Sequence, residues 1–322
     1  MKAVVYEKYG SPDVLEYKDI EKPAIGENEV LIKVFGSSVN FHVPAFMEGK
    51  PLLARLWSGF FRPKENIPGS DIAGQVEAVG SKVKNFSPGD EVFGNIGCFG
   101  AFAEYSVVSE DALVVKPGNV SFIEAAAAAE AAVVALQGLR DKGQIQKGKK
   151  VLICGASGGI GTFAVQIAKS FGAEVTGLCS TGNMEMVRSL GADYVIDYLK
   201  EDFTRNGQKY DLILATAGYH SIFDYRRSLS RQGIYVSTGG ALAQTFQAML
   251  LGPIISMFGR KKMGNITGSI NRNDLLCISQ LLESGRVRSH LDRCYPLKEA
   301  AEALRYYGKG HARGKVGISV HS

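Results

Sequence analysis

The chain has 322 residues, of which 45% are hydrophobic, with 37 Lys and Arg against 32 Asp and Glu, so it is long enough for two hydrophobic cores and is not disordered. The net charge of +5 is scattered, with one basic run at Arg260, Lys261 and Lys262, which argues against a nucleic-acid-binding protein. The five cysteines form no close pairs, which argues against a disulfide framework or a zinc cluster and predicts reduced thiols.

The beginning of the chain predicts a cytoplasmic protein. A predicted strand at residues 4–6 opens the sequence, in place of the basic and apolar segments of a secretory signal. No run of about 18 uncharged apolar residues occurs, so no membrane-spanning helix is expected.

The first hundred or so residues alternate short β-branched runs with Gly and Pro, the pattern of a compact β-rich domain. The expected strands cover residues 4–6, 30–34, 72–79 and 91–93. From residue 122 to 142 good helix formers dominate, and Ser121 with Glu124 predicts a capping box at the start of the helix. Glu130 and Val134 lie one turn apart on this helix, and Glu130 is expected on a solvated face, with a position facing the pocket as the alternative.

Beyond residue 150 buried-strand patterns alternate with helical ones, which predicts βαβ units in a parallel sheet. The expected strands are 151–154, 175–179, 194–196, 212–215 and 234–237, and the expected helices are 161–171 and 183–190. Helices at 273–284 and 297–307 and a strand at 316–319 follow. Because the terminal stretches flank one α/β block, we infer that this block is inserted into the β-rich domain.

A glycine-rich turn directly follows the strand at 151–154 and opens the next helix. In this setting glycine lets the backbone approach a pyrophosphate, and the helix N-terminus supplies N–H donors and positive potential. A tight turn without a ligand is the structural alternative, but the strand and helix around it favour phosphate binding. The predicted contacts to a dinucleotide are Gly155, Ala156, Ser157, Gly158, Gly159, Ile160 and Gly161.

The end of the next predicted strand favours NADPH over NADH. A site for NADH usually has an Asp or Glu there to hold the ribose hydroxyls. Here Ser180 and Thr181 follow the strand, and the first acid is Glu185, so small hydroxyl side chains leave room for a 2′-phosphate. The nearest cation in the sequence is Arg188, a helical turn or more away.

Four motifs spread over nearly the whole chain resemble one known family. They are residues 67–76 with Val79-Gly80 and Gly89-Asp90-Glu91-Val92, the glycine-rich turn, Gly191-Ala192-Asp193 before Val195-Ile196-Asp197-Tyr198, and residues 310–316. Together they resemble the zinc-independent quinone oxidoreductase branch of the medium-chain dehydrogenase/reductase family. The resemblance implies an α/β fold in which a GroES-like β-rich catalytic domain, residues 1–122 and 267–322, holds an inserted, doubly wound Rossmann domain, residues 123–266. It also implies a homodimer.

The resemblance further implies roles for residues outside the turn. Ser180, Thr181 and Tyr198 are expected near the ribose phosphate, Gly239, Gly240 and Lys315 near the nicotinamide half, and Ala217 among the other cofactor contacts. In relatives, hydride passes from C4 of the nicotinamide to a quinone or to the β-carbon of an enone.

No metal is expected, because the ligands of zinc-dependent relatives are missing. Those relatives have an early cysteine, a Gly-His-Glu at the place of Gly69-Ser70-Asp71, and four clustered cysteines, none of which this chain has. Ser70 is a poor zinc ligand.

Two segments depart from the family pattern where the reaction is expected. After Asn40 relatives typically have an Asp and often a Trp, where this chain has residues 41–47, and Val134 stands where relatives have a Thr. We favour a larger, apolar pocket for the substrate; the alternative is a pocket altered for another purpose or with weakened turnover. The predicted pocket residues are Phe41, Phe46, Trp57 and Val134.

Asn40 and His42 are the candidate catalytic side chains. The carboxamide of Asn40 is able to orient the substrate carbonyl or the nicotinamide, with a loop cap as the structural alternative. His42 is able to donate a proton to the enolate oxygen because an imidazole titrates near neutrality, although a lone His is more often structural. If solvent delivers the proton instead, the main task of the protein is to position the substrate.

Two further apolar stretches have open interpretations. Residues 51–64 predict either a lid or a helix packed in the core. Residues 246–258, followed by the basic run at 260–262, predict a wall of a dimer or pocket rather than a segment that touches a membrane, because of a break at Gly252-Pro253.

The sequence therefore predicts an enzyme that uses NADPH to reduce a small electrophile, a quinone or an α,β-unsaturated carbonyl, without zinc. One alternative is an NADP(H)-binding protein with little turnover, acting as a sensor or scaffold or with a repurposed site. Another is a zinc-independent alcohol dehydrogenase.

Overall fold

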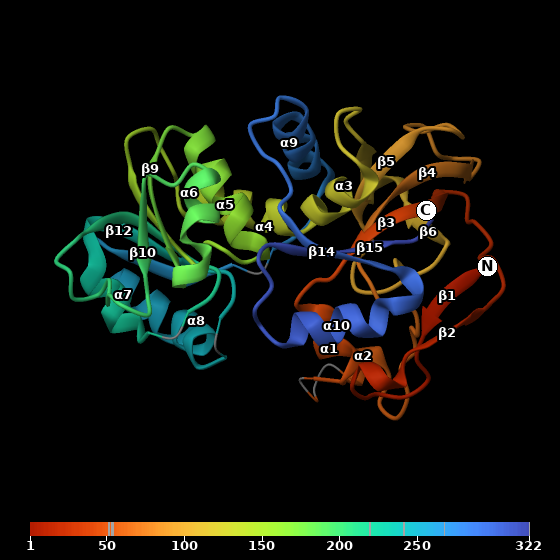
Figure 1. Ribbon diagram of the computed structural model, residues 1–322, viewed down its shortest axis with the longest axis horizontal. Helices are drawn as coiled ribbons and strands as arrows, with labels where there is room; N and C mark the ends of the chain where they lie inside the picture. Colours follow the sequence, from red (N-terminus) through yellow and green to blue (C-terminus); the bar gives the residue numbers. More distant parts are fainter. Residues whose placement is uncertain (51, 53–54, 219, 241, 267, 322) are drawn as a thin grey trace. The chain divides into compact units, whose positions relative to one another are not determined.

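The computed structural model describes residues 1–50, 52, 55–218, 220–240, 242–266 and 268–321, without the side chains of Trp57, Ser58 and Leu242. The chain divides into two units (Figure 1). Unit 1 comprises Met1–Glu130, Ile270–Gly285 and Ser289–Ser322, and unit 2 comprises Ala131–Ser269 and Arg286–Arg288. The chain thus leaves the first unit, builds the second, and returns.

Unit 1 is built on a seven-stranded sheet in the order β14-β15-β3-β4-β5-β7, with β6 paired to β3, and β1 and β2 form a separate two-stranded sheet. The strands are β1 (Lys2–Val5), β2 (Glu16–Asp19), β3 (Glu29–Ser38), β4 (Asp71–Val79), β5 (Glu91–Asn95), β6 (Tyr105–Ser109), β7 (Leu113–Val115), β14 (Leu291–Pro296) and β15 (Lys315–Ser319). The helices are α1 (His42–Met47), α2 (Arg55–Ser58), α3 (Phe122–Ala129), α9 (Arg272–Glu283) and α10 (Ala300–Gly308). Each pair of neighbouring strands is antiparallel except β14 and β15.

The core of unit 1 follows from the alternation of its strands. In β3 the side chains of Val30, Ile32 and Val34 point to one face and are fully buried. They pack against Ile72 and Val92 from the next two strands. The β-branched runs expected at residues 4–6, 30–34, 72–79 and 91–93 all lie in or overlap strands, whereas the patterns of β6 and β7 had not been singled out.

Unit 2 is a six-stranded parallel sheet in the order β10-β9-β8-β11-β12-β13. Its strands are β8 (Lys150–Cys154), β9 (Glu174–Cys179), β10 (Tyr194–Asp197), β11 (Tyr210–Ala215), β12 (Leu229–Ser237) and β13 (Lys262–Asn265). The helices are α4 (Ala131–Gln137), continued by a π-helical turn (Gly138–Lys142), α5 (Gly159–Ser170), α6 (Met184–Ser189), α7 (Ile222–Ser228) and α8 (Leu242–Met257). Figure 1 shows α5 and α6 on one side of this sheet and α7 and α8 on the other, as in a doubly wound fold.

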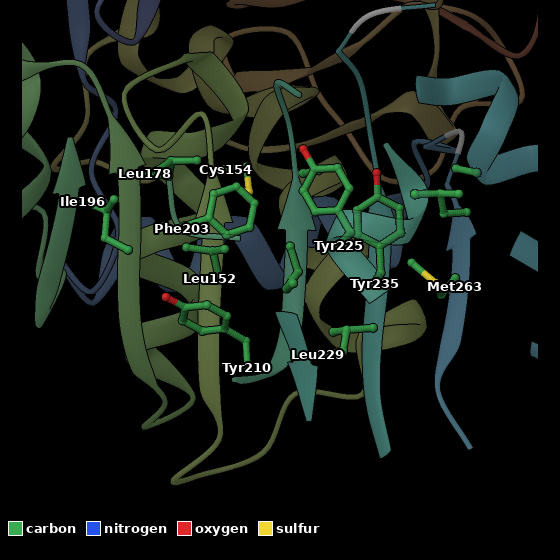
Figure 2. Packing of buried hydrophobic residues seen from close by; sticks show 14 residues of the cluster. Leu152, Cys154, Leu178, Ile196, Phe203, Tyr210, Tyr225, Leu229, Tyr235 and Met263 are labelled. Carbon is green, nitrogen blue, oxygen red and sulfur yellow. The ribbon is translucent and has the colours of Figure 1, made fainter. Parts of the chain in front are cut away.

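Aromatic side chains fill one face of the sheet in unit 2 (Figure 2). The rings of Tyr225 and Tyr235 lie 4.6 Å apart between centroids, and Phe203 lies 5.8 Å from Tyr225. Figure 2 shows the hydroxyl groups of Tyr225 and Tyr235 pointing the same way, and the Tyr235 hydroxyl accepts a hydrogen bond from Nε2 of Gln244 at 2.8 Å. Burial of these rings stabilises the sheet, and the hydrogen bond satisfies a hydroxyl that burial would otherwise leave without a partner.

The helix expected from residue 122 to 142 is interrupted at Glu130. The capping box of Ser121 and Glu124 is confirmed, and α3 ends at Ala129 with Glu130 as its C-cap. The chain then continues as α4 from Ala131. The alanine run has no Gly or Pro, so nothing in it marked this break.

The division between the units lies at Glu130 rather than at residue 122, because α3 packs on the sheet of unit 1. A Cβ at Gly36 in β3 would lie 2.8 Å from the backbone of Phe122 and Ile123, so only glycine allows α3 to start this close. On the return, the side chain of Gln166 in α5 hydrogen-bonds the N–H and the carbonyl of Arg288, each at 2.9 Å. These two hydrogen bonds to the backbone hold Arg286–Arg288 in unit 2.

Each of the two apolar stretches differs from one expected feature. Residues 246–258 lie largely in α8, which runs through Gly252 and Pro253 without a break, and Leu250 in α8 and Phe258 just after it are exposed. In the described part of residues 51–64, the helix α2 is short, and Leu56, Phe60 and Phe61 are exposed, so packing of these three side chains in the core was wrong.

Within the described ranges no single helix is long and apolar enough to span a membrane. The bent pair Phe122–Ala129 and Ala131–Lys142 reaches that length and composition together, and its residues 125–129 and 131–139 are buried. None of the five cysteines, all of which lie in the described ranges, forms a disulfide.

Candidate active site

The glycine-rich turn of unit 2 has a backbone that only glycine allows at two of its positions. Gly155 follows β8 with a φ of +79°, and a Cβ there would lie 2.7 Å from the Cβ of Ala217. A Cβ at Gly161 would overlap the carbonyl oxygen of Gly155, so α5 can pack onto the turn only without a side chain. A Cβ at Gly158, the N-cap of α5, would meet just one neighbouring atom, at 3.4 Å, which leaves this side of the turn open.

The other residues predicted to contact the cofactor in unit 2 follow the carboxyl ends of the parallel strands. Ser180 and Thr181 follow β9, Tyr198 follows β10, Ala217 follows β11, and Gly239 and Gly240 follow β12. Since the strands are parallel, these ends lie along the same edge of the sheet as the glycine-rich turn after β8. The structure thus brings the predicted residues of unit 2 to one edge.

Two residues that were not predicted as part of the cofactor site complete this edge. Asn183 donates from Nδ2 to Ser157 at 3.1 Å and to Ser180 at 3.2 Å, which ties the glycine-rich turn to the end of β9. Asp197 lies close to the end of β9, but its carboxylate accepts a 2.5 Å hydrogen bond from the hydroxyl of Thr181. That hydrogen bond is the main reason why the pKa of Asp197 lies below its ordinary value.

Lys315 lies in β15 of unit 1 and belongs to a buried cluster of polar side chains. We call this cluster the Asp71 network; its members are Ser38, Asn40, Ser70, Asp71, Asn95, Glu130 and Lys315. Asp71 is completely buried and Lys315 is 3% exposed, and their charged atoms lie 3.3 Å apart. Charges buried this deeply need partners, and each has one here.

Asn40 is the central member of the network. Its Nδ2 lies 2.7 Å from Asp71, 2.9 Å from the hydroxyl of Ser70 and 2.9 Å from Glu130, and its Oδ1 accepts a hydrogen bond from Lys315. At 5% exposure, Asn40 is not a cap on a surface loop. From its place just after β3, its amide contacts residues of β4, the end of α3 and β15.

Asn95 and Ser38 complete the shell around the two carboxylates. Asn95 donates to Asp71 at 3.0 Å and to Glu130 at 3.1 Å, and the hydroxyl of Ser38 donates to Asp71 at 2.5 Å. These donors stabilise the negative charges inside the unit.

Glu130 faces the network rather than solvent, so its expected place on a solvated face was wrong. At the break after α3, its side chain, which is 24% exposed, contacts Asn40, Asn95 and His42. Oε2 receives the amide donors, whereas Oε1 lies 3.3 Å from Nδ1 of His42.

The pKa values of Asp71 and Glu130 are shifted in opposite directions. Burial raises the pKa of Asp71 above its ordinary value of 3.8, and the charge of Lys315 offsets this only in part. Burial acts in the same direction on Glu130, but the hydrogen bond and charge of His42, with the charge of Lys315, lower its pKa below 4.5. Carboxyl groups whose environments push them apart in this way occur in catalytic sites.

The predicted pocket residues lie in different surroundings. Phe41 is 73% exposed, and Phe46 packs with its ring centroid 6.0 Å from that of His42 and 5.8 Å from that of Phe99. Val134 is buried in α4 of unit 2. The side chain of Trp57 lies outside the part of the chain that the structure describes.

Sequence reasoning missed Asp71, Asn95 and Glu130 as members of one site. Asp71 stands in the motif at residues 67–76, which was used only for the resemblance and for the missing zinc ligands. A lone Asn such as Asn95 gives no signal of its own. Among the described residues, no three His, Cys, Asp or Glu side chains are grouped so that they could hold a metal ion.

Comparisons with known proteins agree with this architecture. Residues 26–118 match the alcohol dehydrogenase GroES-like domain, and residues 190–316 match a family model described as zinc-binding dehydrogenase. The chain is 34% identical over 335 residues to 2-methylene-furan-3-one reductase from Solanum lycopersicum, covering 99% of this chain and 79% of that protein. It is 33% identical over 335 residues to the chloroplastic NADPH-dependent alkenal/one oxidoreductase of Arabidopsis thaliana, covering 98% and 78%.

The chain belongs to the quinone oxidoreductase family of medium-chain dehydrogenases/reductases. A solved relative, the quinone oxidoreductase from Coxiella burnetii, is 28% identical, with a TM-score of 0.87 over 100% of this chain and 99% of that one. The predicted family and the predicted α/β fold with a GroES-like domain and a Rossmann domain are therefore confirmed. As a member of this family the protein is an oxidoreductase.

Proposed function

We propose that this oxidoreductase reduces an α,β-unsaturated carbonyl or a quinone with a hydride from NADPH. The observation that carries the proposal is the glycine-rich turn joined to a strand end without a free acid, in a chain similar to a named NADPH-dependent alkenal/one oxidoreductase. The similarity to a quinone oxidoreductase of known structure supports the quinone as the second substrate class.

The residues at the edge of unit 2 fit NADPH. The open side of the turn at Gly158 gives a pyrophosphate access to the backbone, and the first N–H groups of α5 have no acceptor within the helix. Asn183 keeps a buried Oδ1 without a hydrogen-bond partner among the described residues, which suits a ribose hydroxyl. Asp197 is already engaged by Thr181, so its charge is partly satisfied beside the place of a 2′-phosphate.

When bound, NADPH supplies a hydride from C4 of its nicotinamide. The turn at Gly155–Gly161 and the residues Ser180, Thr181, Asn183, Tyr198, Ala217, Gly239 and Gly240 hold it. Both polar ends of the Asn40 amide already have partners, so we assign Asn40 to the support of the network rather than to direct binding of substrate. Lys315 has the same supporting role through Asp71, and contact with the nicotinamide stays a prediction.

We further propose that no zinc takes part. This rests on the chemistry of the residues: Ser70 stands at the position of the histidine of zinc-dependent relatives, and its hydroxyl accepts a hydrogen bond from Asn40 at 2.9 Å. The homodimer and the cytoplasmic location stay predictions.

The test is to titrate the purified protein with NADPH and with NADH by fluorescence, then to add pent-3-en-2-one or 1,4-naphthoquinone and follow the loss of NADPH absorbance. We expect tighter binding of NADPH than of NADH, rapid oxidation with at least one electrophile, and no effect of prior treatment with EDTA. Binding of NADPH without oxidation by either compound would contradict the proposal and favour the binding protein with little turnover.

A further inference from the structure

One nitrogen next to the Asp71 network has no partner in the protein. Nε2 of His42 is buried and has no hydrogen-bond partner among the described residues, whereas Nδ1 faces Glu130. A buried polar atom without a partner costs stability, so its presence calls for a reason. The side chain as a whole is 20% exposed, so part of it reaches solvent.

Glu130 fixes which nitrogen of His42 carries a proton at all times. An ionised carboxylate can only accept a hydrogen bond, so Nδ1, 3.3 Å from Oε1, must be the donor. Asn40 and Asn95 donate to the other oxygen, Oε2, and fix the orientation of the carboxylate. The imidazole is therefore held in one orientation with Nε2 pointing away from the network.

To donate a proton from Nε2, His42 must carry protons on both nitrogens, and the ionised carboxylate of Glu130 beside Nδ1 pairs with the resulting positive charge. Cys98 and Tyr307 also feel the charge of Glu130, and burial keeps both in their neutral forms because it raises their pKa values.

We propose that His42, oriented by Glu130, binds the carbonyl oxygen of the substrate through Nε2 and donates the proton that accompanies the hydride. This inference rests on the proposed function. In this proposal His42 has a catalytic role and Glu130 has a positioning role. The aromatic ring of Phe46, 6.0 Å from His42 between centroids, gives the oxygen-binding atom an apolar flank suited to a quinone or a substituted enone.

The step balances as follows for an enone. Hydride adds to the β-carbon, the C=C electron pair shifts, and negative charge develops on the carbonyl oxygen. The Nε2–H bond breaks as an O–H bond forms, which gives an enol that tautomerises to the saturated ketone. NADPH is oxidised, the enone is reduced, and neutral His42 takes a proton from solvent.

The test compares His42→Asn and His42→Gln with wild type, using NADPH and pent-3-en-2-one across a range of pH. Asn and Gln keep an amide donor but cannot transfer a proton, so we expect kcat to fall about 100-fold, within the range of general-acid catalysis, with NADPH binding unchanged. The loss of activity on the alkaline side, present in wild type, should disappear. His311→Asn, a change at an exposed histidine of the same unit, should match wild type.

Glu130→Gln tests the positioning role with a readout that a purely structural role would not move. The amide oxygen still accepts from Nδ1, but the charge is gone, so the alkaline loss of activity should move to lower pH.

A third variant, His42→Ala, removes the imidazole altogether. Free imidazole added to it should restore part of its kcat.

The outcomes separate the two proposals. Wild-type activity with an unchanged kcat and pH profile in both His42 variants would overturn the role of His42 and leave the proposed function standing. Absence of NADPH oxidation by the wild-type protein with both pent-3-en-2-one and 1,4-naphthoquinone would overturn both. Bound NADPH and an unchanged thermal midpoint would establish that each variant is folded.

Discussion

The glycine-rich turn of unit 2 and the Asp71 network of unit 1 assemble their polar groups in different ways. The turn uses neighbouring residues, Gly155 to Gly161, and its ligand-binding groups are backbone N–H groups exposed by glycine. The network draws side chains from strands β3, β4, β5 and β15 and from the end of α3. Because the turn depends on local backbone shape and the network on long-range pairing, different substitutions should damage each.

The largest expected effect is the loss of the buried cation of the network. Lys315→Met leaves Asp71 buried without its counter-charge, and we expect the free energy of unfolding to fall by about 3–5 kcal/mol. Urea denaturation monitored by circular dichroism measures it. The matched control is Lys82→Met, which removes an exposed ion pair with Glu27 and should leave the midpoint nearly unchanged. Equal effects of both changes would show that the network does not need its charge balance.

A substitution in the glycine-rich turn should weaken the binding of NADPH more than it disturbs the Asp71 network. Gly161→Ala places a methyl group against the carbonyl oxygen of Gly155, so the turn must shift, and we expect NADPH to bind at least tenfold more weakly, about 1.4 kcal/mol. Fluorescence titration measures the Kd. Gly264→Ala, in β13 of the same unit, adds a methyl group to open space and serves as the control. An unaltered Kd in Gly161→Ala would contradict the role of the close approach.

The two regions also differ in how far they could be predicted from the sequence. The turn was predicted because its strand, glycines and helix are contiguous, and the strand ends of unit 2 follow from a parallel pattern. Glu130 was placed on a solvated face because the alanine run hides the break between α3 and α4. The apolar residues 41–47 suggested a loss of polar groups, but Asp71, Asn95 and Lys315 supply them from distant segments, and no local pattern shows that pairing.

Acid should distinguish the two carboxylates of the network. The pKa of Glu130 is lowered in the folded state, so its contribution to stability is present above its ordinary value of 4.5 and is lost as pH falls through the folded pKa. Glu130→Gln removes this contribution, so the fall in stability below pH 4.5 should become shallower, by at most about 1.4 kcal/mol per pH unit. Urea midpoints measured from neutral pH downward report it. An unchanged acid slope would mean that Glu130 is not held ionised by its neighbours.

For Asp71 the sign is reversed. Its pKa is raised in the folded state, so protonation favours the folded chain, and this contribution is lost as pH rises through the folded pKa. The two groups therefore oppose each other at acidic pH, and Glu130→Gln should uncover the contribution of Asp71.

The smallest expected effect lies in the aromatic core of unit 2. Tyr235→Phe keeps the ring but removes the hydroxyl that Gln244 contacts, which should cost about 1 kcal/mol in unfolding free energy. Tyr17→Phe, at an exposed tyrosine, is the control. A cost well above this in Tyr235→Phe would indicate that the hydroxyl stabilises more of unit 2 than its contact with Gln244.

The central claim is that hydride from NADPH reaches the β-carbon of an enone while the proton comes from the protein and solvent. The most direct measurement is the reduction of pent-3-en-2-one with NADPH deuterated at C4 of the nicotinamide, using each stereoisomer of the label, followed by NMR of the product. The account predicts pentan-2-one with deuterium on the former β-carbon from one stereoisomer. An allylic alcohol with deuterium on the carbonyl carbon, or no product from either label, would contradict it.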